Sequence, residues 1–137
     1  MFPHLAGMIT LLLFTAIASP QARAAEETIV KVTLNSFKVE MSRTTIPAGT
    51  PVTFEVTNKD SMVHEFVVER AGQVDKPLSA KVGGKAVKSK LEDIAAGKTK
   101  TLKWTFTQPG AYWAACHVEG HFEAGMKTEF RIVAGAK

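Results

Sequence analysis

Apolar and polar side chains alternate in five short runs along the chain. A period of two places successive side chains on opposite faces of a strand, so each run predicts a β-strand with one buried face. Turn-forming residues separate the runs at 47–49, 58–61, 96–98 and 108–110. The pattern predicts an all-β fold, a Greek-key sandwich or barrel of two sheets. The inward positions of the runs are Val30, Val32, Leu34; Val52, Phe54, Val56; His64, Phe66, Val68; Leu102, Trp104, Phe106; and Phe130, Ile132.

Residues 71–97 interrupt this alternation. They contain Gly72, Pro77, the pair Gly83 and Gly84, and scattered lysines. We expect a long loop insertion in the domain, with a helical turn or two near 87–95. Connections of this length are uncommon unless they are functional or mobile, so the insertion is either a solvated connection or an element that binds a partner.

The composition places the chain among ordinary globular proteins. It has 137 residues, 45% of them hydrophobic and 22% charged, which excludes the disordered class and fits one small domain. The sequence contains a single cysteine, Cys116, so an internal disulfide is impossible. Disulfide frameworks, cysteine-rich zinc modules and multi-cluster iron–sulfur proteins are therefore excluded, and Cys116 needs another explanation.

Residues 1–24 are predicted to be a cleaved export signal. An apolar run over 5–18 is followed by Ala22, Arg23 and Ala24, the small-x-small pattern that signal peptidase reads. Cleavage after Ala24 leaves residues 25–137 as one domain, which we expect in the periplasm. A membrane span needs about 20 apolar residues, so no stable membrane insertion is expected. The first residues lack a Lys or Arg, which leaves an uncleaved anchor as the alternative.

Residues 110–126 gather side chains that bind soft and borderline metals. Strand parity directs Cys116 inward at the end of a predicted strand, and two four-residue spacers then lead to His121 and Met126. His64 has inward parity at the start of another strand. Each residue alone has an ordinary explanation, such as a buried thiol, a core methionine or a hydrogen-bonded histidine. Four donors with these spacings and parities instead predict a metal site.

The chemistry of these donors favours copper. Two imidazoles, a thiolate and a distant thioether form the trigonal site with a weak axial ligand that is typical of electron-transfer copper. Thiolate and thioether suit Cu(I), and imidazole suits both oxidation states. Zinc rarely takes a thioether, so Met126 argues against a dedicated zinc site.

At these residues the chain resembles the cupredoxins, the type 1 copper proteins of the plastocyanin and azurin superfamily. The resemblance covers most of residues 25–137. It implies a Greek-key sandwich that holds one copper ion per chain, cycling between Cu(I) and Cu(II), on His64, Cys116, His121 and Met126. The matching segments are 46–49, 52–54, Asn58 ahead of His64, 109–112, and the Cys-x4-His-x4-Met ending.

Two features depart from the family pattern. Glu65 follows the first histidine, where many members have an Asn that braces the ligand loop. The order Cys116-His117-x3-His121-x4-Met126 is closer to the last motif of multicopper oxidases. Those enzymes need many more histidines for a trinuclear cluster, and residues 25–137 contain three. Oxidase activity is excluded on this count, and no enzyme is expected.

Other residues near the motif have two interpretations each. Strand alternation directs the side chain of His117 away from that of Cys116, which predicts a surface imidazole. The alternative is a second metal ligand or a proton-linked switch. Trp113 and Phe122 either line an apolar rim for electron exchange or pack against a neighbouring loop.

Eight lysines lie between Lys76 and Lys103. They form either an ordinary solvated face or a basic surface that steers an acidic partner. Nucleic-acid binding is not expected, because the formal net charge is only +4 and no recognition element is present.

Two functions compete. The first is a monomeric one-electron carrier between redox proteins, such as a cytochrome or a copper oxidase or reductase. The second is a copper-tolerance protein of the bacterial envelope that binds or sequesters copper with the same site. A hydrolase with Cys116 as its nucleophile is disfavoured, because no known nucleophile motif surrounds the cysteine.

Overall fold

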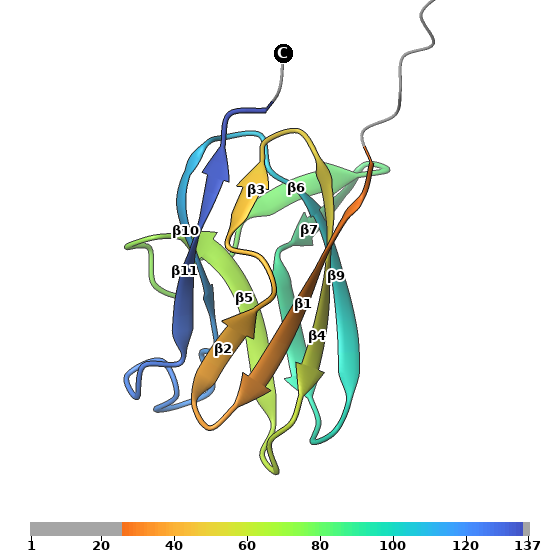
Figure 1. The fold of residues 1–137 in the computed structure, drawn as a ribbon. Coiled ribbons are helices and arrows are strands. Elements are labelled where there is room, and N and C mark those ends of the chain that lie inside the picture. Colours follow the sequence, from red (N-terminus) through yellow and green to blue (C-terminus); the bar gives the residue numbers. More distant parts are fainter. Residues whose placement is uncertain (1–25, 136–137) are drawn as a thin grey trace, which may run out of the picture.

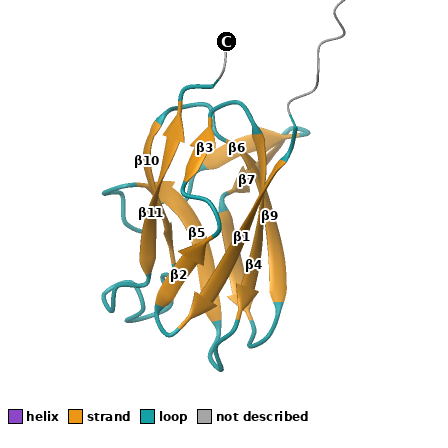
Figure 2. Cartoon of the chain, viewed as in Figure 1, coloured by secondary structure: helices purple, strands orange, loops and turns teal. Residues whose placement is uncertain are grey.

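The computed structural model of the protein describes residues 26–135, and within them it contains eleven strands and no helix (Figure 2). The predicted export signal, residues 1–24, lies outside the described residues. The described residues therefore contain no helix that could span a membrane. The strands are β1 (Thr28–Asn35), β2 (Lys38–Met41), β3 (Thr45–Pro47), β4 (Pro51–Asn58), β5 (His64–Arg70), β6 (Ser79–Val82), β7 (Lys85–Lys88), β8 (Lys90–Ile94), β9 (Thr99–Thr105), β10 (Gly110–Ala115) and β11 (Lys127–Val133).

Two sheets face each other and form a sandwich (Figure 1). One has the strand order β2-β1-β4-β9, and the other has the order β3-β11-β10-β5-β8. The chain passes from one sheet to the other between β2 and β3, β3 and β4, β4 and β5, β8 and β9, and β9 and β10. The pairs β1–β4 and β3–β11 are parallel, and the other pairs in these sheets are antiparallel. The predicted all-β Greek-key sandwich is confirmed.

The core lies between the sheets and contains nearly all of the predicted inward positions, together with residues such as Val39, Ile46 and Ile94 that the alternation did not identify. Phe54 of β4 is near its centre, with ring centroids 5.4 Å from Phe66, 6.3 Å from Phe106 and 6.2 Å from Phe130. Trp104 is only partly buried, unlike the other inward positions. Burial of alternate side chains from both sheets is therefore what holds the sandwich together.

Residues 71–97 differ from the prediction. They form strands β6, β7 and β8, so the prediction of helical turns near 87–95 is wrong. Gly83 and Gly84 have φ angles of 55° and 79°, a left-handed conformation that glycine adopts without strain and that closes the two-residue β6–β7 hairpin. β8 pairs with β5 at the edge of the five-stranded sheet. Most side chains of β6 and β7 are exposed, so no buried stripe marks these strands in the sequence.

The same segment covers the outer face of β5. The hydroxyl of Ser89 donates to the carbonyl of Val68 at 2.6 Å, and the backbone N–H of Leu78 bonds to the same strand. Val67 and Glu69, on the face of β5 that points away from the core, are buried, and the carboxylate of Glu69 accepts the N–H of Lys76 from this segment. The loops β1–β2, β4–β5, β8–β9 and β10–β11 gather at one end of the sandwich, at the bottom of Figure 1.

Candidate metal centre

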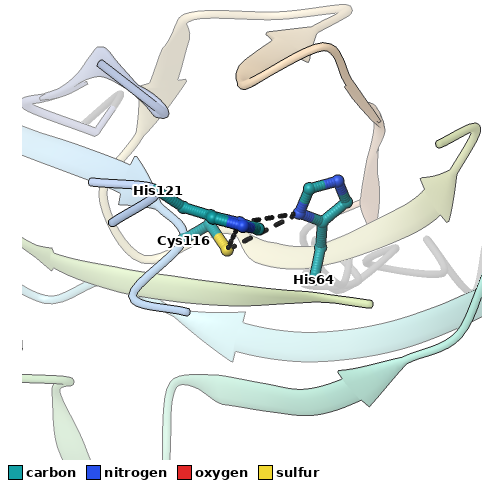
Figure 3. Close-up of side chains that lie close together, drawn as sticks. All are labelled: His64, Cys116 and His121. Atoms are coloured by element: carbon teal, nitrogen blue, oxygen red, sulfur yellow. Dashed lines mark hydrogen bonds between the residues drawn. The ribbon is translucent and has the colours of Figure 1, made fainter. Parts of the chain in front are cut away.

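Three of the four predicted donors meet at this end of the sandwich (Figure 3). The sulfur of Cys116 lies 3.5 Å from Nδ1 of His121 and 3.8 Å from Nδ1 of His64. The two Nδ1 atoms are 3.2 Å apart. His64 and Cys116 have no exposed surface, and 8% of His121 is exposed. The structure therefore brings His64 next to Cys116 and His121, 52 and 57 residues away in the sequence, in a single buried cluster of one sulfur and two nitrogens.

The hydrogen bonds of the β10–β11 loop place Cys116, His121 and Met126 together. The N–H of Cys116 donates to the carbonyl of Met126, and the N–H of Met126 donates to the carbonyl of His121, both at 3.0 Å. Gly120 and Gly125 have φ angles of 79° and 96°, which a residue with a side chain rarely adopts. The loop thus closes on itself, and Met126, the fourth predicted donor, is fully buried next to the other two.

His64 is held from its far side. Its Nε2 lies 3.2 Å from Oδ2 of Asp60, whose carboxylate also accepts the backbone N–H groups of Ser36 and Ser61 at 3.0 Å each. The hydrogen bond to His64, followed by those from Ser36 and Ser61, lowers the pKa of Asp60. The carboxylate can accept a hydrogen bond from an Nε2–H group of His64, and in that tautomer Nδ1 has a free lone pair that faces the cluster.

Asn58 fixes the loop that carries Asp60 and His64. Its buried amide nitrogen donates to the carbonyl of Met62 at 2.7 Å and to that of Ile94 at 2.8 Å. Its side-chain oxygen accepts the N–H of Asp60 at 2.8 Å. A fully buried Asn with this many bonds specifies the loop conformation, because each lost bond would leave a buried polar group unsatisfied.

The buried environment of Cys116 favours the protonated thiol over the thiolate. Burial raises its pKa, and backbone hydrogen bonds from Glu65 and Val118 only partly oppose this effect. The N–H of Glu65 lies 3.3 Å from the sulfur. This contact comes from the backbone, so it does not require the Asn found in many family members, and the Glu65 carboxylate pairs with Lys90 at 3.4 Å instead.

Cys116 in the metal-free protein is expected to resist alkylation. A buried thiol with a raised pKa presents little thiolate to the reagent, so iodoacetamide should react on the order of 100-fold more slowly with folded than with urea-unfolded protein. Mass spectrometry of samples quenched over time measures both rates. Equal rates would contradict the burial of the sulfur and would favour a reactive, nucleophilic cysteine.

The donor set fits one copper ion. Bonds from imidazole or thiolate to a first-row metal are about 2.0–2.3 Å long, so donor atoms 3–4 Å apart can share one ion. Burial, followed by the nearby His64, lowers the pKa of His121, which favours the neutral imidazole that binds metals. A thiol, two imidazoles and a buried methionine together suit copper better than zinc or magnesium.

The sequence profile of the cupredoxin-like domain family matches residues 7–127. The chain belongs to this family. The chain is 28% identical over 108 residues to the copper-resistant cuproprotein CopI of Rubrivivax gelatinosus, covering 77% of this chain and 66% of the relative. It thus spans just under two thirds of that protein's length.

Solved structures with similar folds include reduced auracyanin of Roseiflexus castenholzii, with a TM-score of 0.57 and 20% identity over 80% of this cupredoxin and 98% of that chain. Rusticyanin of Thiobacillus ferrooxidans has a TM-score of 0.60 and 18% identity, covering 78% and 77% of the two chains. A multicopper oxidase of Pediococcus acidilactici has a TM-score of 0.54 and 18% identity, and 30% of that chain is matched. These likenesses confirm the cupredoxin fold.

His117 of this cupredoxin is not the surface imidazole expected from the sequence. Its ring does point away from Cys116, but it is mostly buried, and Nε2 lies 3.1 and 3.2 Å from the two carboxylate oxygens of Glu69. Glu69 also accepts the N–H of Lys76 at 3.1 Å. The prediction is wrong because residues 71–97 cover this face of the sheet, which strand parity alone would leave exposed.

Trp113 and Phe122 pack against each other, with ring centroids 5.9 Å apart. The ammonium of Lys127 lies over both rings, 4.9 and 4.3 Å from their centroids, and Phe122 stacks on His117 at 4.8 Å. The structure therefore supports the second interpretation of these two residues, in which they pack the ligand loop against strands β10 and β11.

Two residues beside the donors were missed in the sequence. Phe37 approaches His121 edge-on with ring centroids 5.1 Å apart, and it is 38% exposed. Asp60 contacts His64. The sequence did contain a signal for Asp60. This carboxylate lies in the predicted turn at 58–61, only four residues before the proposed donor His64. Nothing in the sequence marks Phe37, which reaches the site only through the β1–β2 hairpin.

Proposed function

We propose that this protein is an exported one-electron carrier that holds a single copper ion with His64, Cys116, His121 and Met126. The observation that carries the proposal is the cluster of His64, Cys116 and His121, whose ligand atoms lie within 4.8 Å of one another with all three residues buried. Bound copper would supply a one-electron couple between Cu(I) and Cu(II). The mature protein, residues 25–137, is proposed to act as a monomer in the periplasm.

The framework suits electron transfer because the donors are fixed before metal binds. His64 is anchored by Asp60, and the loop from Cys116 to Met126 is closed by its own backbone hydrogen bonds. Donors that are already positioned need little rearrangement when the charge of the ion changes. His121, the most exposed of the three clustered donors, lies against the exposed ring of Phe37, so this is the side on which a redox partner would approach.

The partners are proposed to be redox proteins, such as a cytochrome or a copper oxidase or reductase. The lysines of 76–103 favour an acidic partner through long-range attraction. Lys81, Lys85 and Lys88 lie on or next to the β6–β7 hairpin, toward the end of the sandwich opposite the ligand loops (Figure 1). They would raise the rate of encounter without forming the contact through which the electron passes.

A copper-tolerance role is the second candidate, and the likeness to the copper-resistant cuproprotein CopI supports it. The same donors would then sequester copper or hold it during oxidation of Cu(I). This role predicts expression induced by copper and a deletion strain that is sensitive to copper. The carrier role predicts a growth or respiration defect that does not depend on added copper.

The test of the proposed site is the visible spectrum of residues 25–137 titrated with Cu(II). An intense thiolate-to-copper charge-transfer band that saturates at one copper per chain is expected. Copper binding without this band would contradict a type 1 site. Reversible one-electron voltammetry of the loaded protein then tests whether the site can carry electrons.

Met126→Leu is expected to keep both copper and colour while the reduction potential rises. Leucine has nearly the volume of methionine, so the buried position stays filled. It removes a weak axial thioether, whose loss destabilises Cu(II) more than Cu(I). Voltammetry and copper analysis of the variant measure both properties. If the variant lost copper and colour together, Met126 would be a principal ligand and not a weak axial one.

A further inference from the structure

Both ring nitrogens of His64 are engaged, and they face opposite directions. Nδ1 faces Cys116 and His121, and Nε2 faces Asp60 at 3.2 Å. The ring of His64 is fully buried, whereas the side chain of Asp60 is 18% exposed. The carboxylate of Asp60 therefore links the buried imidazole to the loops at the surface, because it contacts His64 and also accepts hydrogen bonds from Ser36 and Ser61.

Asp60 is held in place by three loop contacts that do not involve the metal donors. Its Oδ2 accepts the N–H of Ser36 in the β1–β2 turn, its Oδ1 accepts the N–H of Ser61, and its own N–H donates to Asn58. Ser36 and Phe37 have φ angles of 51° and 57°, the left-handed conformation of a two-residue hairpin turn. This turn directs the N–H of Ser36 toward the carboxylate.

We propose that Asp60 is a positioning residue that fixes the Nε2–H form of His64 and biases the copper site toward Cu(II). A carboxylate that accepts the second N–H of a metal-bound histidine fixes its tautomer and makes the ring a stronger donor. A stronger donor and a nearby negative charge both stabilise the ion of higher charge. The inference rests on the proposed copper site and adds a determinant of its reduction potential.

The first test compares Asp60→Asn with Glu65→Gln in residues 25–137 loaded with copper. Both substitutions remove one carboxylate charge near His64, but Glu65 contacts Lys90 and not the imidazole. Asp60→Asn is expected to lower the ratio of Cu(II) to Cu(I) affinity about tenfold, which is a rise of about 59 mV in a one-electron potential. Glu65→Gln is expected to shift the potential by a clearly smaller amount. Equal shifts in both variants, or no shift in Asp60→Asn, would overturn the positioning role.

The second test needs no copper. Long-range 1H–15N NMR spectra of the metal-free protein at about pH 8, where an ordinary histidine is neutral, report which nitrogen of His64 carries the proton. The wild-type protein is expected to show His64 protonated at Nε2, and Asp60→Ala is expected to show a mixture of both forms. A wild-type His64 protonated at Nδ1 would overturn the proposal. Failure of the copper site would instead appear as a missing charge-transfer band in the wild-type protein, so the two failures are distinguishable.

Discussion

Cys116→Ser is expected to abolish the thiolate-to-copper charge-transfer band and to weaken Cu(II) binding. The band arises from the thiolate, and a serine hydroxyl is a harder donor that stays protonated at neutral pH. Loss of an outer partner of a metal ligand typically costs 10–100-fold in affinity, so loss of the ligand itself should cost more than about 100-fold. Visible absorption and competition titration against a chelator of known affinity measure the two effects.

The matched control is His117→Gln at the adjacent position. His117 faces Glu69 and not the donor cluster, and glutamine keeps an N–H donor for that carboxylate. This variant should retain the band and one copper per chain. Serine is close in shape to cysteine, so Cys116→Ser should also remain folded, with the N–H of Glu65 available to the new hydroxyl. A coloured Cys116→Ser protein would refute the ligand assignment.

Phe54→Ala is expected to lower the free energy of unfolding of the metal-free protein by about 3–5 kcal/mol. Phe54 has no exposed surface and touches aromatic rings from strand β5, strand β11 and the segment after β9. Truncation leaves a cavity that these rings cannot all close. Because small domains are stable by only about 5–15 kcal/mol, this loss should move the urea midpoint strongly. Urea unfolding followed by fluorescence gives the free energy and the m-value.

Phe37→Ala provides the comparison for this core substitution. It removes the same number of atoms from a side chain that is partly exposed and contacts His121 at its edge. The expected loss is about 1 kcal/mol or less. Similar losses in both variants would show that the aromatic cluster around Phe54 does not form the centre of the core.

The predicted strands agree with the structure because the alternation of apolar and polar side chains that predicts each strand lies within that strand. Leu34, Phe54 and Phe130 occupy inward positions that a period of two already identifies, and each is buried in the structure. Parity also identifies two of the four proposed donors, because Cys116 continues the inward face of β10 and His64 begins the inward face of β5. His121 and Met126 were identified by their spacing after Cys116. Sequence spacing was enough to nominate these residues without any knowledge of how the sheets pack.

The features that the sequence did not reveal depend on contacts between distant segments. The β6–β7 hairpin exposes most of its side chains and so lacks a hydrophobic period. Burial of His117 against Glu69 depends on residues 71–97 folding over the outer face of β5. The bond from Ser36 to Asp60 joins two loops that are 24 residues apart.

The strand pattern, the sandwich fold and the candidate donors could all be predicted from the amino-acid sequence. These properties depend on side-chain period and donor chemistry, which each segment carries locally. Three contacts could be seen only in the folded protein. Nδ1 of His64 lies 3.2 Å from Nδ1 of His121, Asp60 contacts the far side of the His64 ring, and the mostly buried side chain of His117 faces Glu69. Such contacts depend on the packing of two sheets and the closure of several loops at one end of the sandwich. The backbone conformation that brings them together is set by the whole fold and not by neighbouring residues.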